Sequence, residues 1–223
     1  MSKYNKKKIQ VAIDSPAAAG AGTQSKLISK HYNLFYLDSG KIYRYLAYLK
    51  MKNLKKFNYS FISKKMKLLK MSDLQNKKLL SDEVGSKASI IAKDVKIRKL
   101  AHNFQMKCAY SPPKKYDGSI IDGRDITYNI MPDADFKFFI TASAKTRALR
   151  RYKELKRLNK RISLKEVLKS IIKRDNSDYN RRISPLKRTK DQYLISSENE
   201  SKRSCFLKIK QIIDKNSTLN GNI

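Results

Sequence analysis

The sequence has little of three things that define whole classes of protein: cysteine, long apolar runs and acidic side chains. Its two cysteines, Cys108 and Cys205, are far apart in the chain, which gives neither a disulfide framework nor the spacing of a zinc site. We therefore expect a protein of the reducing cytoplasm. The apolar segment 9–13 is too short for the core of a secretion signal. No later segment is long enough to span a bilayer, so we expect no membrane contact.

Acidic residues are outnumbered, because 19 Asp and Glu stand against 51 Lys and Arg and the formal net charge is +32. Such a charge attracts polyanions, so nucleic acid is a candidate partner. The excess is mainly lysine, however, and it is scattered along the chain, which favours a general compositional bias over a binding surface. We therefore do not expect nucleic acid as a partner. An RNA-binding function would rest on charge alone, without a recognisable aromatic stacking motif.

Short apolar segments alternate with helical patterns along the 223 residues, a length that fits one α/β domain. Strands are predicted at 9–13, 34–37, 119–122, 136–141 and 193–195. Helical patterns occupy 23–31, 42–52, 85–109, a segment from the capping box of Ser163 and Glu166 to about Asp175, and the C-terminal region around Ile209. This alternation predicts a parallel β-sheet with helices on both faces.

A run of small residues follows the first predicted strand. It consists of Ser15, Pro16, Ala17, Ala18, Ala19, Gly20, Ala21, Gly22 and Thr23. Small residues let backbone N–H groups surround phosphate oxygens, and the next helix adds its positive N-terminal end. Compared with the phosphate-loop pattern G-x-x-x-x-G-K-[ST], Ser15 replaces the first glycine and Ala21 replaces the lysine. Taken alone, the segment would favour a structural turn.

Five further segments contain charged, glycine or proline residues in short motifs. They are D-S-G-K-I-Y-R at 38–44, D-G-R-D at 122–125, P-D-A at 132–134, R-D-N-S-D-Y-N-R at 174–181 and S-P-L at 184–186. Their order and spacing resemble those of bacterial cytidylate kinases. Residues 14–23 resemble that family's D-G-P-x-G-x-G-K-[GS]-T, and the resemblance runs from Ile9 to the last helix. It implies a P-loop nucleoside monophosphate kinase that phosphorylates CMP and dCMP with ATP, while Mg²⁺ bridges the ATP phosphates.

The resemblance also implies roles for individual residues. Arg44 and Arg124 would hold the acceptor phosphate. Arg174 and Arg181 would lie in a mobile lid. The catalytic residues would be Arg124, Arg174 and Arg181. Planar guanidinium groups suit this work because they bind phosphate oxygens in pairs and stay charged. The ATP phosphates would contact residues 15–23 and one arginine of the basic segment 147–151, for which we choose Arg150. No metal ligand from the protein is expected, since Mg²⁺ in such sites keeps several waters.

The nucleoside would be bound by a second set of residues. The substrate-binding residues implied by the resemblance are Ser39, Tyr43, Arg44, Ser89, Arg98, Arg124, Asp125, Asp178 and Arg181. Ser89 and Arg98 lie in a segment similar to the family's S-x-V-A…V-R helix. An acidic acceptor such as Asp125 suits cytosine, whose exocyclic amine donates a hydrogen bond. Asp178 would bind the ribose.

The family's lysine is missing at Ala21, and the loss of one such stabiliser typically costs about a hundred- to a thousand-fold in rate. Lys26 and Lys41 are candidate replacements. The alternative is a CMP-binding pseudokinase with impaired catalysis. Two further departures concern the family's I-R-T-x-E-V, which is L-L-S-D-E-V at 79–84 and lacks the arginine, and its D-G-R-D-x-G-T, which ends in I-T-Y at 126–128.

The resemblance further implies one kinase domain over residues 1–223, which we expect to be a monomer. Its core would comprise 9–52, 85–158 and 190–215. A shortened NMP-binding insert would occupy about 53–84, and a helical lid about 159–189.

Overall fold

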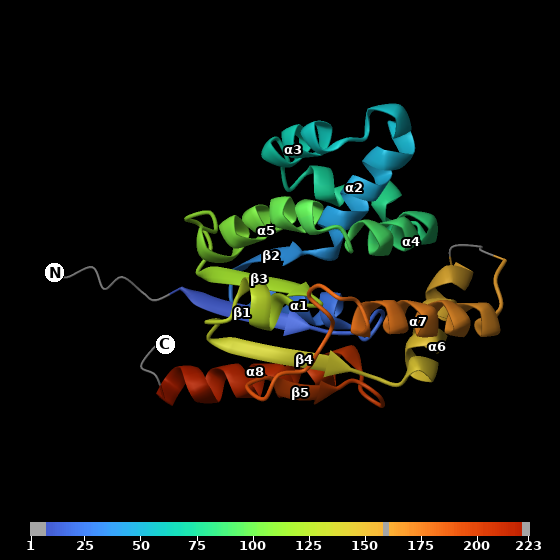
Figure 1. The fold of residues 1–223 in the computed structure, drawn as a ribbon. Helices are drawn as coiled ribbons and strands as arrows, with labels where there is room; N and C mark the ends of the chain where they lie inside the picture. Colours follow the sequence, from blue (N-terminus) through green and yellow to red (C-terminus); the bar gives the residue numbers. More distant parts are fainter. Residues whose placement is uncertain (1–7, 158–160, 220–223) are drawn as a thin grey trace.

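The computed structural model describes residues 8–157 and 161–219. Five parallel strands form one sheet in the order β2-β3-β1-β4-β5, which confirms the predicted α/β class (Figure 1). The strands are β1 Ile9–Asp14, β2 Leu34–Asp38, β3 Gly118–Gly123, β4 Phe136–Thr141 and β5 Tyr193–Ser196. Each predicted strand is therefore present, within one or two residues of its expected ends.

The central strand β1 is buried on both faces, which explains its continuous apolar sequence. Val11 and Ile13 pack into a core with α1 (Ala21–His31) and α8 (Lys202–Leu219), and Ala12 belongs to the core on the opposite face. Beside β1, β3 begins at Gly118, where an added Cβ would lie 1.8 Å from the carbonyl oxygen of Ile9. Only glycine permits this approach of the two strands.

The face of Ala12 is covered by α2 (Gly40–Lys52), α4 (Asp82–Ile91) and α5 (Val95–Tyr110). Sequence periodicity predicts one helical stretch over 85–109, and this expectation is wrong at its centre. The chain turns after Ile91, and Asp94 caps α5 by accepting a hydrogen bond from the Ile97 N–H at 3.0 Å. The division bends the chain so that α4 and α5 both pack against the same core.

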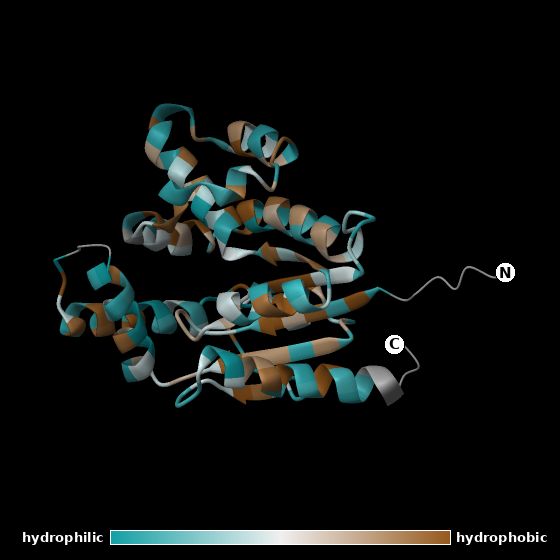
Figure 2. Cartoon of the chain, turned by 180° about the vertical axis from the view of Figure 1, so that it is seen from behind, coloured by the Kyte–Doolittle hydropathy of each residue, from teal (hydrophilic) through white to brown (hydrophobic). Residues whose placement is uncertain are grey.

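Residues 53–84 form short helices beside α2 and α5 (Figures 1 and 2). They are η1 Leu54–Lys56, α3 Tyr59–Lys67, η2 Asp73–Gln75 and η3 Lys77–Leu80. Ile62, Met66 and Leu74 are buried in the core that also contains α2 and α5. Hydrophilic and hydrophobic residues alternate along the segment (Figure 2): most of its lysines are exposed, and its buried residues are apolar.

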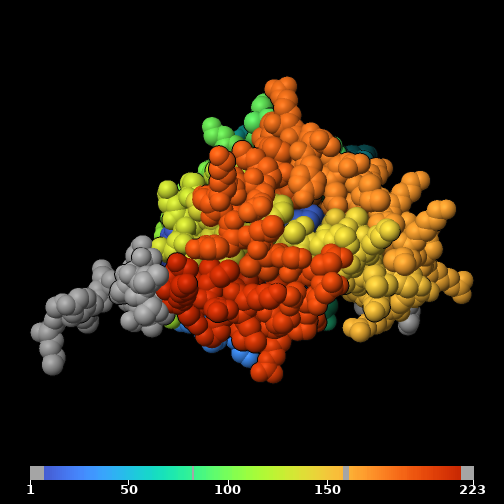
Figure 3. Space-filling model, turned by 90° about the horizontal axis from the view of Figure 1, so that it is seen from below, coloured from blue at the N-terminus to red at the C-terminus, as the bar shows by residue number. Residues whose placement is uncertain are grey.

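Two helices, α6 (Ala144–Arg157) and α7 (Leu164–Tyr179), project beyond the carboxyl ends of the strands (Figure 1). They pack on each other through a small apolar cluster of their own: Ala148, Leu155, Val167 and Ile171. The predicted capping box of Ser163 is present, and α7 continues to Tyr179, past the predicted end. Seen from below, the C-terminal segment covers one face and the two helices gather at its end (Figure 3). None of the helices in the described residues has both the length and the apolarity to cross a membrane.

Candidate active site

The loop of small residues joins the end of β1 to the start of α1. Its backbone bends through two left-handed residues, Ala18 with a φ of 61° and Gly20 with a φ of 98°. Thr23 and Gln24 donate their N–H groups to the Gly20 carbonyl at 3.0 and 3.1 Å, so α1 begins immediately after the bend. The helix thus points its positive end into the space beyond the sheet, where an anion would be stabilised.

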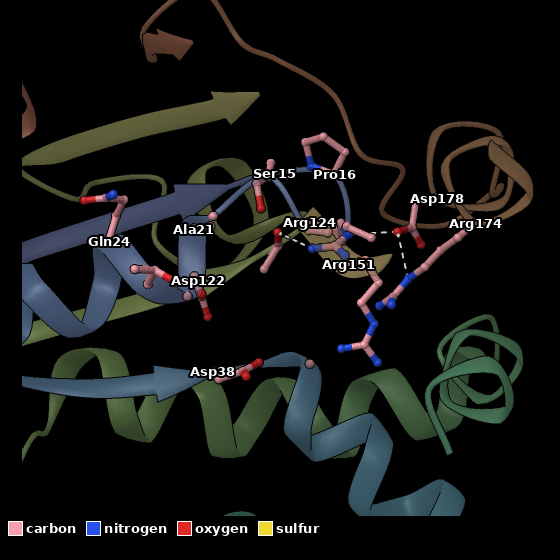
Figure 4. A pocket seen from close by; sticks show the side chains of 18 of the residues that line it. Ser15, Pro16, Ala21, Gln24, Asp38, Asp122, Arg124, Arg151, Arg174 and Asp178 are labelled. Atoms are coloured by element: carbon pink, nitrogen blue, oxygen red, sulfur yellow. Dashed lines mark hydrogen bonds and ion pairs between the residues drawn. The ribbon is translucent and has the colours of Figure 1, made fainter. Parts of the chain in front are cut away.

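That space is a cavity of about 880 Å³ at the carboxyl ends of β1, β2 and β3 (Figure 4). All the residues predicted for the site line this cavity: Ser15, Pro16, Ala17, Ala18, Ala19, Gly20, Ala21, Gly22, Thr23, Ser39, Tyr43, Arg44, Ser89, Arg98, Arg124, Asp125, Arg150, Arg174, Asp178 and Arg181. Lys26 lines it as well, whereas Lys41 is not among its lining residues. The parallel sheet explains why the residues after β1, β2 and β3 gather here, since the ends of its strands meet at one edge. The remaining side chains come from helices that border this edge and from the residues just after α7.

Two arginines share one carboxylate on the α7 side of the cavity. Arg124, just after β3, donates from Nε to Asp178 Oδ2 at 2.7 Å, and the Nε of Arg174 lies 3.9 Å from the same oxygen (Figure 4). Within the described residues the buried Nε of Arg174 has no hydrogen-bond partner. Burial and the charge of Arg124 lower the pKa of Arg174 to about 10. This pair therefore holds more positive charge than Asp178 neutralises.

Burial alone would raise the pKa of Asp178, but the nearby charges of Arg124 and Arg174 outweigh it and lower that pKa. Asp178 is thus ionised at neutral pH and fixes Arg124 in place. The remaining capacity of the two guanidinium groups suits a phosphate, which accepts paired hydrogen bonds from arginine.

A second buried group surrounds Asp125. Arg98 donates from Nη2 to Asp125 Oδ2, Asn129 donates to the same oxygen at 2.9 Å, and Arg181 Nη2 lies 3.6 Å from Oδ1. Within the described part of the chain, Arg181 Nη2 and the hydroxyl of Tyr43 are buried without hydrogen-bond partners. Burial raises the pKa of Tyr43 to about 12, so its hydroxyl remains a donor. Buried polar atoms are costly when they have no partner, so these two donors suit a polar ligand.

Arg44 and Ser89 are placed by the helices that border the 53–84 segment. Arg44 donates from Nη1 to the carbonyls of Leu79 and Ser81 at 2.8 and 3.0 Å. Gly85 makes room for this guanidinium, because an added Cβ would lie 2.8 Å from Arg44 Nη2. Ser89 is half-buried and donates its hydroxyl to its own helix, so of the two Arg44 is the more firmly fixed at the cavity wall.

The arginines of the basic segment of α6 differ in their burial and in their hydrogen-bond partners. The choice of Arg150 stays a prediction: its guanidinium lines the cavity and donates from Nη1 to Ser197 Oγ at 3.0 Å. Arg147 is the buried member, and it donates to the Ala17 carbonyl in the phosphate loop at 3.0 Å and to Asp175 of α7. Sequence reasoning missed this connection because no local pattern links residues so far apart.

Three acidic residues stand at the ends of neighbouring strands. Asp14 accepts hydrogen bonds from the N–H groups of Ile126 and Thr127 at 2.8 and 3.0 Å, and burial raises its pKa to about 6. These bonds hold the turn at Ile126–Ile130, where the chain departs from the family motif. Asp38 and Asp122 lie below the start of α1 (Figure 4). Burial and the charge of Asp38 raise the pKa of Asp122 well above its ordinary value.

A small-residue loop that leads from the central parallel strand into a helix, facing an arginine-lined cavity, defines the class of α/β proteins that bind nucleotides at a phosphate loop. Residues 11–215 match the family described as "Cytidylate kinase". The chain therefore belongs to the cytidylate kinase family.

Several similar proteins bear the same name. A cytidylate kinase of Clostridium tetani is 37% identical over 223 residues, covering 95% of this chain and 93% of the relative. One from Mesomycoplasma hyopneumoniae strain 7448 is 34% identical, with 93% and 94% covered, and one from Bartonella tribocorum is 38% identical, with 88% and 90% covered. A crystal structure of an uncharacterized protein from Eubacterium ventriosum has a TM-score of 0.54 at 17% identity, covering 93% and 99% of the two chains, and supports the fold alone.

Proposed function

We propose that the protein transfers the terminal phosphoryl group of ATP to CMP and dCMP, as a cytidylate kinase. The observation that carries this proposal is that one cavity joins the phosphate loop to a separate set of guanidinium groups. Phosphoryl transfer needs two polyanions aligned and their spreading charge neutralised, and the protein does little covalent work. The family membership of the chain supports the same reaction.

The acceptor phosphate would bind between Arg124, Arg174 and Arg44. Support comes from the buried Nε of Arg174, which lacks a hydrogen-bond partner among the described residues, and from its crowding against Arg124. An arriving phosphate would supply the missing acceptor and relieve the repulsion between the two cations. Closure of the 159–189 lid, which contains α7, over the site would exclude water, which otherwise competes as the acceptor.

Cytosine would bind beside Asp125, whose Oδ1 is engaged only by the more distant Arg181 among the described residues. That oxygen would accept a hydrogen bond from the exocyclic amine, a group that uracil lacks. The unpaired hydroxyl of Tyr43 and Nη2 of Arg181 are donors that suit the remaining acceptors of the base. Asp178 would contact the ribose through Oδ1, since Arg124 and Arg174 approach its Oδ2.

ATP would place its phosphates on the loop of residues 15–23, close to Arg150. Mg²⁺ bound with ATP would supply positive charge that offsets the charge of these phosphates. The carboxylates of Asp38 and Asp122, at the strand ends below the loop, fit a hydrated Mg²⁺ as acceptors for its waters. No group of three or more His, Cys, Asp or Glu side chains in the described residues would hold a metal ion by itself.

The resemblance to the family also supports a compartment, an oligomeric state and a domain layout. The protein would act in the cytoplasm as a monomer, with residues 53–84 as a monophosphate-binding insert and 159–189 as a lid over the core. The packing of α6 on α7 through their own apolar cluster supports a movable lid.

One experiment separates the kinase from a CMP-binding pseudokinase, the alternative that Ala21 favours. ADP production from ATP and Mg²⁺ is measured with CMP, dCMP, UMP and AMP in turn, and CMP binding is measured by calorimetry. The kinase predicts turnover with CMP and dCMP well above that with AMP. Binding of CMP without CMP-dependent turnover would show a pseudokinase instead.

A further inference from the structure

The start of α1 lacks a positively charged side chain. Ala21 is the first residue of the helix and ends in a methyl group, although it lines the cavity where a phosphate would lie. The loop of residues 15–23 contains no charged side chain at all. Backbone N–H groups and the helix dipole remain, but they do not equal a full charge on the transferred phosphoryl group.

Lys26 lies one turn further along the same helix, on the face of Gly22. Residues four apart are neighbours on a helix surface, and side chains lean toward the helix N-terminus. The stem of Lys26 therefore runs back toward Gly22, which has no side chain to obstruct it. A Cβ at Gly22 would lie 3.3 Å from Asp122 Oδ2 and 3.4 Å from the Tyr36 hydroxyl, so this face of α1 borders the acidic strand ends.

The charge of Lys26 acts inside the cavity. Burial and the charge of Asp38 raise the pKa of Asp122. The charge of Arg124 lowers that pKa in part, and the ammonium group of Lys26 lowers it by a smaller amount. Lys26 also lines the cavity together with Ala21, while Lys41 does not. The rival arginines have other partners: Arg150 bonds to Ser197, and Arg151 pairs with Glu154 at 2.8 Å.

We propose that Lys26 supplies the positive charge that the loop lacks at Ala21, by placing its ammonium group against the terminal phosphate of bound ATP. Lys26 exchanges no proton and forms no covalent bond in this role; it neutralises charge on the phosphoryl oxygens as they pass from ADP to the CMP phosphate. Its side chain is exposed, so it can swing from the Asp122 side toward the phosphates. This inference rests on the proposed kinase function.

The test is a double-mutant cycle between positions 21 and 26. In the wild-type chain, Lys26→Met is expected to lower kcat about a hundred-fold or more, the usual cost of losing one such stabiliser. In the Ala21→Lys chain, the same Lys26→Met change should cost less than about five-fold, because the restored lysine fills the place. The matched control is Lys30→Met, an exposed lysine one turn further along α1 and outside the cavity lining, which should leave kcat within about two-fold in either chain.

Binding gives an independent measurement. Calorimetry with a non-hydrolysable ATP analogue and Mg²⁺ should show weaker binding for Lys26→Met in the wild-type chain and nearly unchanged binding in the Ala21→Lys chain. If Lys26→Met weakens binding of the analogue equally in the wild-type and Ala21→Lys chains, the inference is overturned. It is also overturned if the effect of Arg151→Met depends on the residue at position 21 and the effect of Lys26→Met does not. If the wild-type protein binds CMP but shows no CMP-dependent turnover, the proposed function itself fails, a result distinct from turnover without coupling.

Discussion

Arg147 and Asp175 join α6 to α7 through two parallel hydrogen bonds, from Nη1 to Oδ1 at 3.0 Å and from Nη2 to Oδ2 at 2.5 Å. The same guanidinium donates from Nη1 to the carbonyl of Ala17 and from Nε to that of Ala142. One buried side chain thus ties the phosphate loop to both projecting helices. Because the loop carries no charged side chain, its shape depends on such contacts.

Replacing Arg147 by methionine is expected to lower the free energy of unfolding by about 3 kcal/mol, since it leaves the Asp175 carboxylate and two carbonyls without their partner. It should also raise the KM for ATP more than the KM for CMP, because the loop loses a support. Urea denaturation and steady-state kinetics measure these effects. Arg203→Met, at an exposed arginine of α8, is the control and should change stability by less than about 0.5 kcal/mol. A loss no larger than the control's would contradict this role.

The left-handed backbone of Ala18 predicts opposite effects for two neighbouring substitutions. With a φ of 61°, Ala18 pays a steric cost of about 1–2 kcal/mol that glycine avoids. Ala18→Gly should therefore leave stability unchanged or raise it by up to about 1 kcal/mol, even after the larger entropy of unfolded glycine. Ala17, whose φ is not positive, is the matched control, and Ala17→Gly should lose about 0.5–1 kcal/mol. Thermal unfolding decides the matter: two losses of equal size would refute the strain at Ala18.

The sequence allows the sheet to be predicted because each strand is a short apolar run bounded by turn residues. It also allows the candidate site to be predicted as a set. The motifs at 14–23, 38–44 and 122–125 begin at strand ends that a parallel sheet brings to one edge, and the motif at 174–181 lies at the end of α7. Three features escape prediction: the turn between α4 and α5, the bond from Arg147 to the phosphate loop, and the sharing of Asp178 by two arginines. The bonds from Arg147 to Ala17 and from Arg124 to Asp178 join segments distant in sequence, which no local periodicity encodes. The turn is set locally by the Asp94 cap of α5, within a stretch whose apolar periodicity continues through it.

The crowding of Arg174 against Arg124 predicts that stability and activity separate at this position. The Nε of Arg174 is buried and has no hydrogen-bond partner among the described residues. It lies 3.9 Å from an Asp178 oxygen that already accepts a hydrogen bond from Arg124. Arg174→Met should therefore lower the free energy of unfolding by less than about 0.5 kcal/mol, or raise it. The kcat should fall by about a hundred-fold or more, because a charge at the proposed acceptor-phosphate site is lost.

Two further variants make this measurement specific. Arg188→Met removes an exposed arginine outside the cavity lining and should change neither quantity. Arg174→Lys keeps the charge but not the paired geometry of guanidinium, so it should restore only part of the lost activity. The stabilisation that saturating CMP gives to wild type in thermal unfolding should shrink in Arg174→Met. A marked loss of stability in the absence of CMP would show that Arg174 is a structural residue.

The burial of Asp14 predicts a pH dependence of stability with a definite sign. Its pKa rises from 3.8 to about 6 on folding, so between these values the folded chain holds a proton that the unfolded chain has released. The stability due to this group is therefore fully present below about pH 4, and it is lost as pH rises through 6. A shift of this size corresponds to about 3 kcal/mol.

Asp14→Asn cannot titrate, and it weakens the bonds to Ile126 and Thr127 at every pH. The difference in unfolding free energy between wild type and Asp14→Asn, measured in urea from pH 4 to 7, should thus shrink by about that amount. A difference that stays constant would mean that Asp14 remains ionised throughout this range.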